Sequence, residues 1–361
     1  MFNRTNSRAN GRFLLGVCAL LLCAAAQAAE TQLANVVILA TGGTIAGTGA
    51  TSTTTVGYTA ATVGVQNLIK AVPELAKVAN VTGEQVFQIA SENMGNEHWL
   101  TLAKRVNLLL AQANVDGIVI THGTDTLEET AYFLDLVVKS RKPVVLVGAM
   151  RPSTALSADG PINLYNAVLL AASQEAVGKG VLVAMNDQIQ AAREVTKTNT
   201  STLDAFRTPE LGMLGYIQGS KPYFYRLSSR KHTVDTEFDV AALAALPQVD
   251  IVYGYANMGP VAVDAFVAAG SKGIIHAGVG DGSLAAKVVP ALSAARKSGV
   301  IIVRASRVGQ GILARNGEAN DDQLDFVVAD TLNPQKARIL LMLALTRTSS
   351  TKEIQRMFST Y

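Results

Sequence analysis

The chain has 361 residues, of which 49% are hydrophobic and 16% charged, with 30 Gly, 10 Pro and 2 Cys. This apolar content excludes a disordered chain, ordinary Gly and Pro usage excludes a collagen-like sequence, and two cysteines are too few for a disulfide-rich scaffold. At roughly 100–200 residues per domain, the length predicts two domains with room for packed cores.

Residues 1–28 have the features of a secretory signal peptide. Arg4, Arg8 and Arg12 precede an apolar run at 13–26, and the small residues at 26–28 (Ala-Gln-Ala) provide a cleavage site. The run is shorter than the roughly 20 residues of a membrane-spanning helix, which argues against the alternative of an uncleaved anchor. We therefore expect a periplasmic protein without a membrane anchor once this leader is removed.

The formal net charge of +3 comes from the same leader. It carries three of the 31 basic residues, none of the 28 acidic residues and both cysteines, so the remainder is neutral and free of cysteine. Neutral charge and a single Trp argue against a nucleic-acid groove. A chain without cysteine is indifferent to an oxidising compartment.

Beyond the leader, apolar runs bounded by Gly alternate with helical stretches, which is typical of an α/β protein with a mostly parallel sheet. We expect strands at 36–40, 117–121, 144–147, 181–184, 251–255, 273–276 and 300–303, and helices at 127–138, 162–173, 261–269 and 284–297. The predicted fold has a larger N-terminal domain (29–225), in which helices flank the mostly parallel sheet, and a smaller C-terminal α/β domain (248–361). A polar, basic stretch is interpreted as the linker, 226–247.

Ligands of parallel sheets bind beyond the carboxyl ends of the strands, so the residues that directly follow each predicted strand are candidates for chemistry. Gly42, Gly43 and Thr44 follow the first strand, where adjacent glycines permit a tight turn and Thr44 presents a hydroxyl. The glycine spacing does not match G-x-G-x-x-G, and no P-loop motif occurs. The segment 48–58 is rich in Thr, Ser and Gly, which predicts a loop, either a lid over a site or an ordinary surface loop.

A second candidate turn follows the strand at 117–121. Thr124 and Asp125 lie at an expected helix start, where they can bind a ligand. The alternative is that Asp125 or Thr126 caps the helix. A threonine nucleophile needs a base or a lowered pKa, and Lys197 among Thr and Asn residues is a candidate proton shuttle. Its alternative is a solvated surface lysine.

Other catalytic patterns are missing from the sequence. The four histidines have no metal-ligand spacing, H-E-x-x-H is absent, and no G-x-S-x-G nucleophile elbow occurs. His122 at a strand end is expected to be a hydrogen-bonded interior histidine. Asp321 and Asp322, near Glu318, are expected to form a solvated acidic loop.

Taken together, these segments resemble the bacterial type II L-asparaginases and periplasmic glutaminase-asparaginases, over essentially the whole chain after the leader. The resemblance rests on strings that stand in this order: I-L-A-T-G-G-T-I-A-G at 38–47, T-H-G-T-D-T-L-E-E-T-A at 121–131, G-A-M-R-P at 148–152, N-L-Y-N-A at 163–167, V-T-K-T-N-T at 195–200 and L-N-P-Q-K-A-R at 332–338. It implies hydrolysis of L-asparagine to L-aspartate and ammonia, with no metal, no organic cofactor and a homotetrameric assembly.

The resemblance also assigns roles to residues. The nucleophile falls on Thr44, the lid tyrosine on Tyr58, and a carboxylate from the C-terminal domain, expected to be hydrogen bonded to Tyr58, on Glu318. A second catalytic cluster falls on Thr124, Asp125 and Lys197. Recognition of the substrate's α-amino and α-carboxyl groups falls on Ser91, Glu92 and Asp125. A residue supplied by a neighbouring subunit falls on Ser283.

Two positions depart from the asparagine-specific pattern of the family. Glu92 stands where many asparagine-selective members have Gln, and Ser283 where some have Asn. Because members with this Glu resemble those that hydrolyse glutamine well, we expect substantial glutaminase activity. The alternatives are a family member that serves another amide and, from another class, a periplasmic amino-acid-binding protein without turnover.

Overall fold

The computed structural model describes residue 1 and residues 32–361. Apart from Met1, the expected signal peptide lies outside the described residues. Residues 34–361 form one unit of the chain, and the description below concerns this unit. Among the described residues, none of the helices combines the length and the hydropathy of a membrane span.

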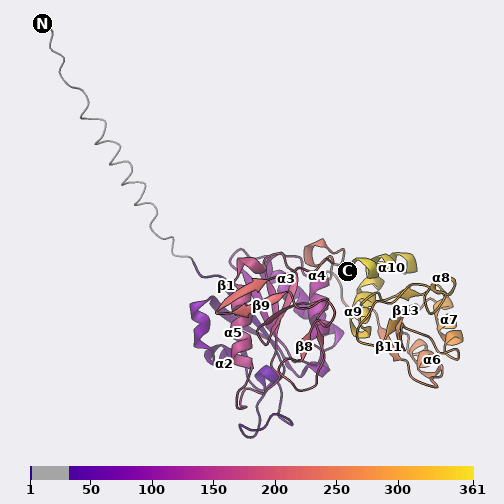
Figure 1. The fold of residues 1–361 in the computed structure, drawn as a ribbon, viewed down its shortest axis with the longest axis horizontal. Coiled ribbons are helices and arrows are strands. Elements are labelled where there is room, and N and C mark those ends of the chain that lie inside the picture. Colours follow the sequence, from indigo (N-terminus) through magenta and orange to yellow (C-terminus); the bar gives the residue numbers. More distant parts are fainter. Residues whose placement is uncertain (2–31) are drawn as a thin grey trace. The chain divides into compact units, whose positions relative to one another are not determined.

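An eight-stranded sheet dominates the first two thirds of the unit (Figure 1). Its strands in spatial order are β10 (Lys221–Phe224), β9 (Gly215–Gln218), β6 (Gln188–Ala191), β5 (Val181–Met185), β4 (Val144–Val147), β3 (Gly117–Thr121), β1 (Asn35–Gly42) and β2 (Asn80–Ile89). The five strands from β5 to β2 are parallel, whereas β6, β9 and β10 add antiparallel pairs at the other end. A separate two-stranded ribbon consists of β7 (Thr196–Lys197) and β8 (Phe206–Arg207).

Helices cover both faces of this sheet, which explains why its central strands are continuous apolar runs. Ile38 and Val119 point to the face packed by α2 (Val65–Lys70) and α5 (Gly160–Ala171). Leu39 and Ile118, one residue out of phase, point to the opposite face, packed by α3 (Asn96–Leu110) and α4 (Leu127–Val137). Each strand thus buries side chains in two cores.

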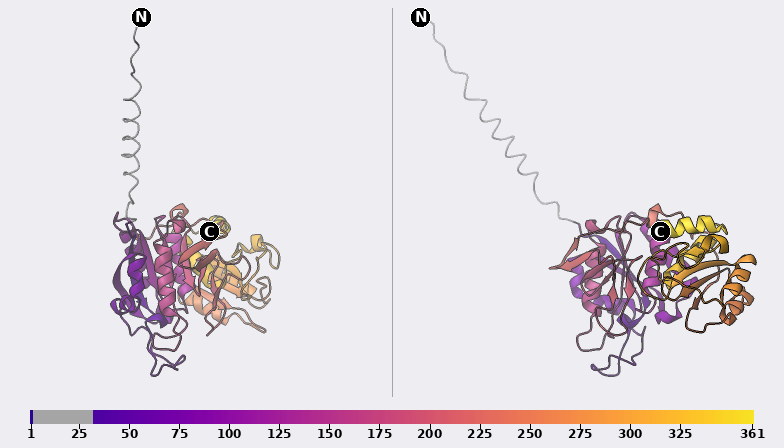
Figure 2. Two further views of the ribbon diagram at one scale, coloured as in Figure 1. Left: turned by 60° about the vertical axis from the view of Figure 1, so that its left-hand side comes forward. Right: turned by 45° about the vertical axis from the view of Figure 1, so that its right-hand side comes forward.

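A smaller parallel sheet follows, with strands in the order β11 (Val249–Tyr253), β12 (Gly273–Gly278), β13 (Ile301–Ser306) and β14 (Val327–Val328). It carries α6 (Val261–Ala268), α7 (Val289–Lys297), α8 (Asp321–Leu324), α9 (Pro334–Leu345) and α10 (Thr351–Thr360). Figure 2 shows α9 and α10 in yellow beside the orange strands of this sheet. Pro334 opens α9, and the Asn333 side chain caps it by accepting the Lys336 N–H at 3.0 Å.

The α/β prediction, with a larger mostly parallel sheet and a smaller second sheet, is confirmed. One expected helix is shorter than predicted, because α7 begins at Val289 and not at 284. The stretch at 226–247 is packed rather than free: Phe238 and Val240 are buried in the core, and the Thr236 hydroxyl donates to Leu136 O. Two apolar residues separated by a polar one thus anchor this segment in the core, next to α4.

Candidate active site

Two glycine turns meet at the carboxyl ends of β1 and β3. The strands pair in parallel with Ala40 beside Thr121, so the turns that follow them emerge side by side. A Cβ on Gly43 would lie 2.2 Å from the Gly123 Cα, and Gly43 has a φ of +81°. Only glycine permits both this backbone conformation and this approach, which brings the residues after each turn to one edge of the sheet.

Thr44 is hydrogen bonded to the tyrosine of the predicted lid. Its side chain is buried, and its Oγ1 lies 2.6 Å from the Tyr58 Oη. The loop that carries Tyr58 is closed at its base by paired backbone hydrogen bonds between Thr48 and Thr59, at 2.9 and 3.0 Å. The hydroxyl of Thr44 therefore has a partner that can accept its proton.

Thr124 and Asp125 share a lysine. Lys197 Nζ on β7 donates to Thr124 Oγ1 at 2.9 Å and to Asp125 Oδ1 at 2.6 Å. The Lys197 side chain is 16% exposed, and the Asp125 side chain is 60% exposed. The surface interpretation of Lys197 is therefore wrong. The capping interpretation of this turn is also wrong, because no side chain caps α4 and Thr126 Oγ1 donates to Ser91 O instead.

His122 lies beneath this turn as a neutral, hydrogen-bonded side chain. Complete burial lowers its pKa to about 4. Its Nδ1 lies 2.7 Å from the Gly123 carbonyl oxygen and therefore donates, which leaves Nε2 to accept the Thr130 hydroxyl at 2.9 Å. The expectation of a hydrogen-bonded interior histidine is confirmed.

Ser91 follows β2, the strand next to β1, and lies in a short 3-10 turn, Ser91–Asn93. Its buried hydroxyl accepts the Asp125 backbone N–H at 3.2 Å. Glu92 is exposed. The predicted recognition residues Ser91 and Asp125 therefore lie together at the same sheet edge as Thr44 and Thr124.

Ser283 and Glu318 form a second pair, in the part of the chain that contains the smaller sheet. Ser283 Oγ donates to Glu318 Oε2 at 3.0 Å. Among residues 32–361, no hydrogen bond joins Tyr58 to Glu318, so the expected Tyr58–Glu318 contact is not made within this one chain. The sequence analysis assigned only Ser283 to a neighbouring subunit, whereas in this chain Glu318 is grouped with Ser283 and not with Tyr58.

The acidic segment next to Glu318 is the short helix α8, in which Asp322 is exposed as expected but Asp321 is not, which corrects the expectation for Asp321. Asp321 is fully buried and accepts two hydrogen bonds from Arg304, at 2.9 Å each. Arg304 also donates to the carbonyls of Asp281 at 2.7 Å and Ala314 at 2.8 Å, so it ties together the loops that carry Ser283 and Glu318. An arginine within an apolar strand was the sequence signal for this buried ion pair.

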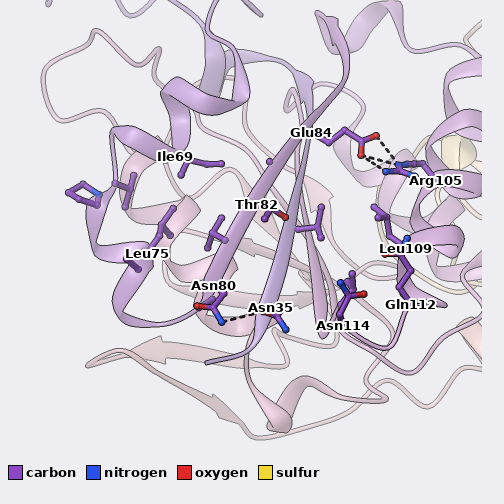
Figure 3. A pocket seen from close by; sticks show the side chains of 18 residues that line it. Asn35, Ile69, Leu75, Asn80, Thr82, Glu84, Arg105, Leu109, Gln112 and Asn114 are labelled. Carbon is purple, nitrogen blue, oxygen red and sulfur yellow. Dashed lines mark hydrogen bonds and ion pairs between the residues drawn. The ribbon is translucent and has the colours of Figure 1, made fainter. Parts of the chain in front are cut away.

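A hollow of about 880 Å³ lies elsewhere, along the edge strand β2 (Figure 3). Its wall includes Asn80 and Glu84 from the amino half of β2, together with Arg105 of α3, which makes a bidentate pair with Glu84. Ser91 follows the opposite, carboxyl end of the strand. This hollow is therefore separate from the candidate active site.

Among residue 1 and residues 32–361, no group of three or more His, Cys, Asp or Glu side chains is arranged to hold a metal ion. The polar groups gathered at the candidate site are the Thr44 and Thr124 hydroxyls, the Tyr58 hydroxyl, the Lys197 ammonium group and the Asp125 carboxylate. This set is suited to nucleophilic attack with proton transfer.

Comparison with known proteins agrees with this class. The family model "Asparaginase, N-terminal" matches residues 35–230, and "Glutaminase/Asparaginase C-terminal domain" matches residues 248–358. The chain is 56% identical to a glutaminase-asparaginase of Pseudomonas fluorescens biotype A, over 97% of this chain and 98% of the relative. It is 50% identical to a probable periplasmic L-asparaginase of Haemophilus influenzae, over 96% of this chain and 99% of the relative.

A solved structure, that of a probable cytoplasmic L-asparaginase from Campylobacter jejuni, superposes with a TM-score of 0.89 at 51% identity, covering 91% of this chain and all of the other. The protein is an enzyme, a hydrolase that acts on amides. It belongs to the asparaginase family.

Proposed function

We propose that this enzyme hydrolyses the side-chain amide of L-asparagine, giving L-aspartate and ammonia, and that it also hydrolyses L-glutamine. The observation that supports this most is the pair of touching turns, which present Thr44 with Tyr58 and Thr124 with Lys197 at one sheet edge. The relatives named for both amides support the choice of substrates.

Thr44 is the proposed nucleophile. Its Oγ1 attacks the amide carbon while Tyr58 Oη, 2.6 Å away, takes its proton and passes the phenolic proton on to the carboxylate of Glu318 of the partner subunit. The tetrahedral intermediate carries an oxyanion, which the backbone N–H groups of the glycine turns stabilise. When the C–N bond breaks, the proton passes to the leaving nitrogen, ammonia departs, and an ester to Thr44 remains.

Thr124 and Lys197 act in the second half of the proposed reaction. They position the water that attacks the ester carbon, which releases the acid and returns a proton to Thr44. In this arrangement Lys197 holds the Thr124 hydroxyl at 2.9 Å while its charge is balanced by Asp125. Closure of the loop that carries Tyr58 excludes bulk water from the ester.

Substrate recognition is assigned to Ser91, Glu92 and Asp125. Carboxylates at 92 and 125 suit an α-ammonium group, and the Ser91 hydroxyl offers a hydrogen bond to the α-carboxyl group. Glu92 in place of Gln changes the charge around the substrate amine, not around the reacting amide. On this basis we expect glutamine to be a good substrate.

Ser283 and Glu318 are proposed to complete the site of a neighbouring subunit in a homotetramer. They are hydrogen bonded to each other, so the subunit that supplies Ser283 also supplies Glu318. The leader-like residues 1–28 support export to the periplasm. The domain division at 29–225, 226–247 and 248–361 is part of the same proposal.

The test is ammonia release from L-asparagine and L-glutamine by wild-type protein, by Thr44→Ala and by the control Thr101→Ala. Thr101 lies on the exposed side of α3 and donates only to its own helix, at Glu97 O. We expect Thr44→Ala to lower kcat by at least about 1,000-fold, because the nucleophile is lost, and Thr101→Ala to behave as wild type.

Three results would contradict parts of the proposal. A wild-type kcat in Thr44→Ala refutes the role of Thr44 as the nucleophile. Stoichiometric binding of asparagine without ammonia release identifies a binding protein instead. Glutamine turnover at only a trace of the asparagine kcat/KM refutes the glutaminase activity.

A further inference from the structure

The first turn of α9 contacts two segments that adjoin the candidate active site, the loop between β6 and β7 and the start of α4. This turn belongs to the motif L-N-P-Q-K-A-R at 332–338. We propose that Asn333, Gln335 and Lys336 are positioning residues that fix the contact between Lys197 and Thr124 by holding the chain on either side of it. The inference rests on the proposed function, in which that contact serves catalysis.

Lys336 holds the segment that leads to Lys197. It is 1% exposed, and its Nζ donates to the carbonyls of Ala192 at 2.9 Å, Arg193 at 2.9 Å and Val195. An ammonium group has three N–H donors, so these carbonyls use all of them. Val195 is two residues before Lys197, so this contact fixes the start of β7.

Gln335 and Asn333 hold the helix that follows Thr124. Glu128, in the first turn of α4, is buried and accepts Gln335 Nε2 at 2.9 Å and Asn333 Nδ2 at 3.3 Å. Glu128 is four residues after Thr124, with the Asp125 turn between them. The first turn of α9, which begins at Pro334, is therefore hydrogen bonded both to the segment before Lys197 and to the helix after Thr124.

The hydrogen bonds made by Lys336 and Glu128 can hold the distance between Lys197 and Thr124 constant. Lys336, Glu128 and the carbonyls of Ala192 and Val195 are buried, so water cannot easily replace a broken hydrogen bond. Burial lowers the pKa of Lys336 to about 8, which leaves it protonated at neutral pH with all three donors. Among the described residues, Lys336 makes no hydrogen bond to Lys197, so its effect on catalysis is indirect.

The experiment is a double-mutant cycle in the full-length enzyme between Lys336→Met and Lys197→Met. Lys142→Met is the matched control, because Lys142 Nζ also donates to two backbone carbonyls, those of Leu110 at 3.0 Å and Gln112 at 2.7 Å. Lys142 precedes β4 and so lies at the amino ends of the strands, opposite the site. The readouts are kcat and KM for ammonia release, with the folded fraction measured by circular dichroism.

We expect Lys336→Met to lower kcat by about 10- to 100-fold through misplacement of reacting groups, with a smaller change in KM. In the Lys197→Met background the same substitution should change kcat less than about twofold, because the contact it positions is already gone. Lys142→Met should keep the wild-type kcat. If Lys336→Met does not fold, Gln335→Met, which removes a single hydrogen bond to Glu128, replaces it in the cycle. Its effect on kcat should likewise be less than about twofold in the Lys197→Met background.

The outcomes separate the two proposals. If Lys197→Met lowers kcat and the kcat effects of the two single substitutions multiply in the double variant, the positioning role is overturned but the proposed role of Lys197 is not. Wild-type kcat in Lys197→Met overturns the proposed role of Lys197 and the positioning role with it. A loss of kcat in Lys142→Met equal to that in Lys336→Met also overturns the inference, since it would show a general effect of losing a lysine held by carbonyls.

Discussion

Replacement of Gly43 by Ala tests whether contact between the two glycine turns is needed for catalysis. The added Cβ would lie 2.2 Å from the Gly123 Cα, whereas ordinary contacts begin at 3.4 Å, so the turns must separate by about 1 Å. That displacement moves Thr44 relative to Thr124. A misplacement of this size costs about 100-fold in rate.

The same substitution has a stability cost that can be divided into two parts. Gly43 has a φ of +81° and a ψ of −170°, an extended backbone that costs about 1–3 kcal/mol at a residue with a Cβ, and overpacking adds about 1–3 kcal/mol. Gly270→Ala is the matched control: its φ of +89° is close to that of Gly43, yet nothing lies within 4 Å of its Cβ position. It should show only the backbone cost and keep wild-type kcat.

The assays are kcat/KM for ammonia release and the free energy of unfolding from urea titration. We expect Gly43→Ala to be less stable than Gly270→Ala by about 1–3 kcal/mol and about 100-fold less active. Activity within threefold of wild type in Gly43→Ala would show that the close approach of the turns is not what aligns the two threonines.

Two further predictions concern buried charges. Arg304→Met leaves the Asp321 carboxylate in the interior without its counter-charge, although it keeps the Asn316 backbone N–H at 2.8 Å, so urea titration should show a loss of about 3–5 kcal/mol. A loss below about 1 kcal/mol would mean that the pair is not buried in solution. Burial raises the pKa of Glu129 from 4.5 to about 7, even though Arg338 lies 3.9 Å away and opposes the rise. The folded state thus keeps a proton that the unfolded state loses between these pH values, so stability should fall as pH rises from 4.5 to 7, by up to about 3 kcal/mol for this group. Glu129→Gln should flatten that part of the urea-denaturation pH profile, and an unchanged profile would refute the assignment.

The sequence predicted the parts of the fold that local pattern determines. Continuous apolar runs marked the buried strands such as β3 and β4, and Gly followed by Thr marked both turns of the proposed site. It missed β2, because this edge strand is only half-buried and lacks a continuous apolar run. Ser91, which follows β2, was therefore reached only through family resemblance.

Contacts between distant segments account for what pattern reasoning could not supply. Asp321 was expected in solvent because nothing local shows that Arg304, in a strand 17 residues earlier, reaches it. Lys336 was noted only as part of a motif, since its carbonyl partners lie more than 140 residues away. Polar residues are buried when a tertiary partner satisfies them, and that partner is not visible in a short window of sequence.

The hydrophobic cluster that contains Leu39 and Ile118 also contains Ile275 and Val303 of the smaller sheet and Leu340 of α9. Neither sheet therefore has a complete core when the other is absent. Heating should consequently melt both sheets in a single calorimetric transition, and a fragment truncated before β11 should expose enough apolar surface to aggregate.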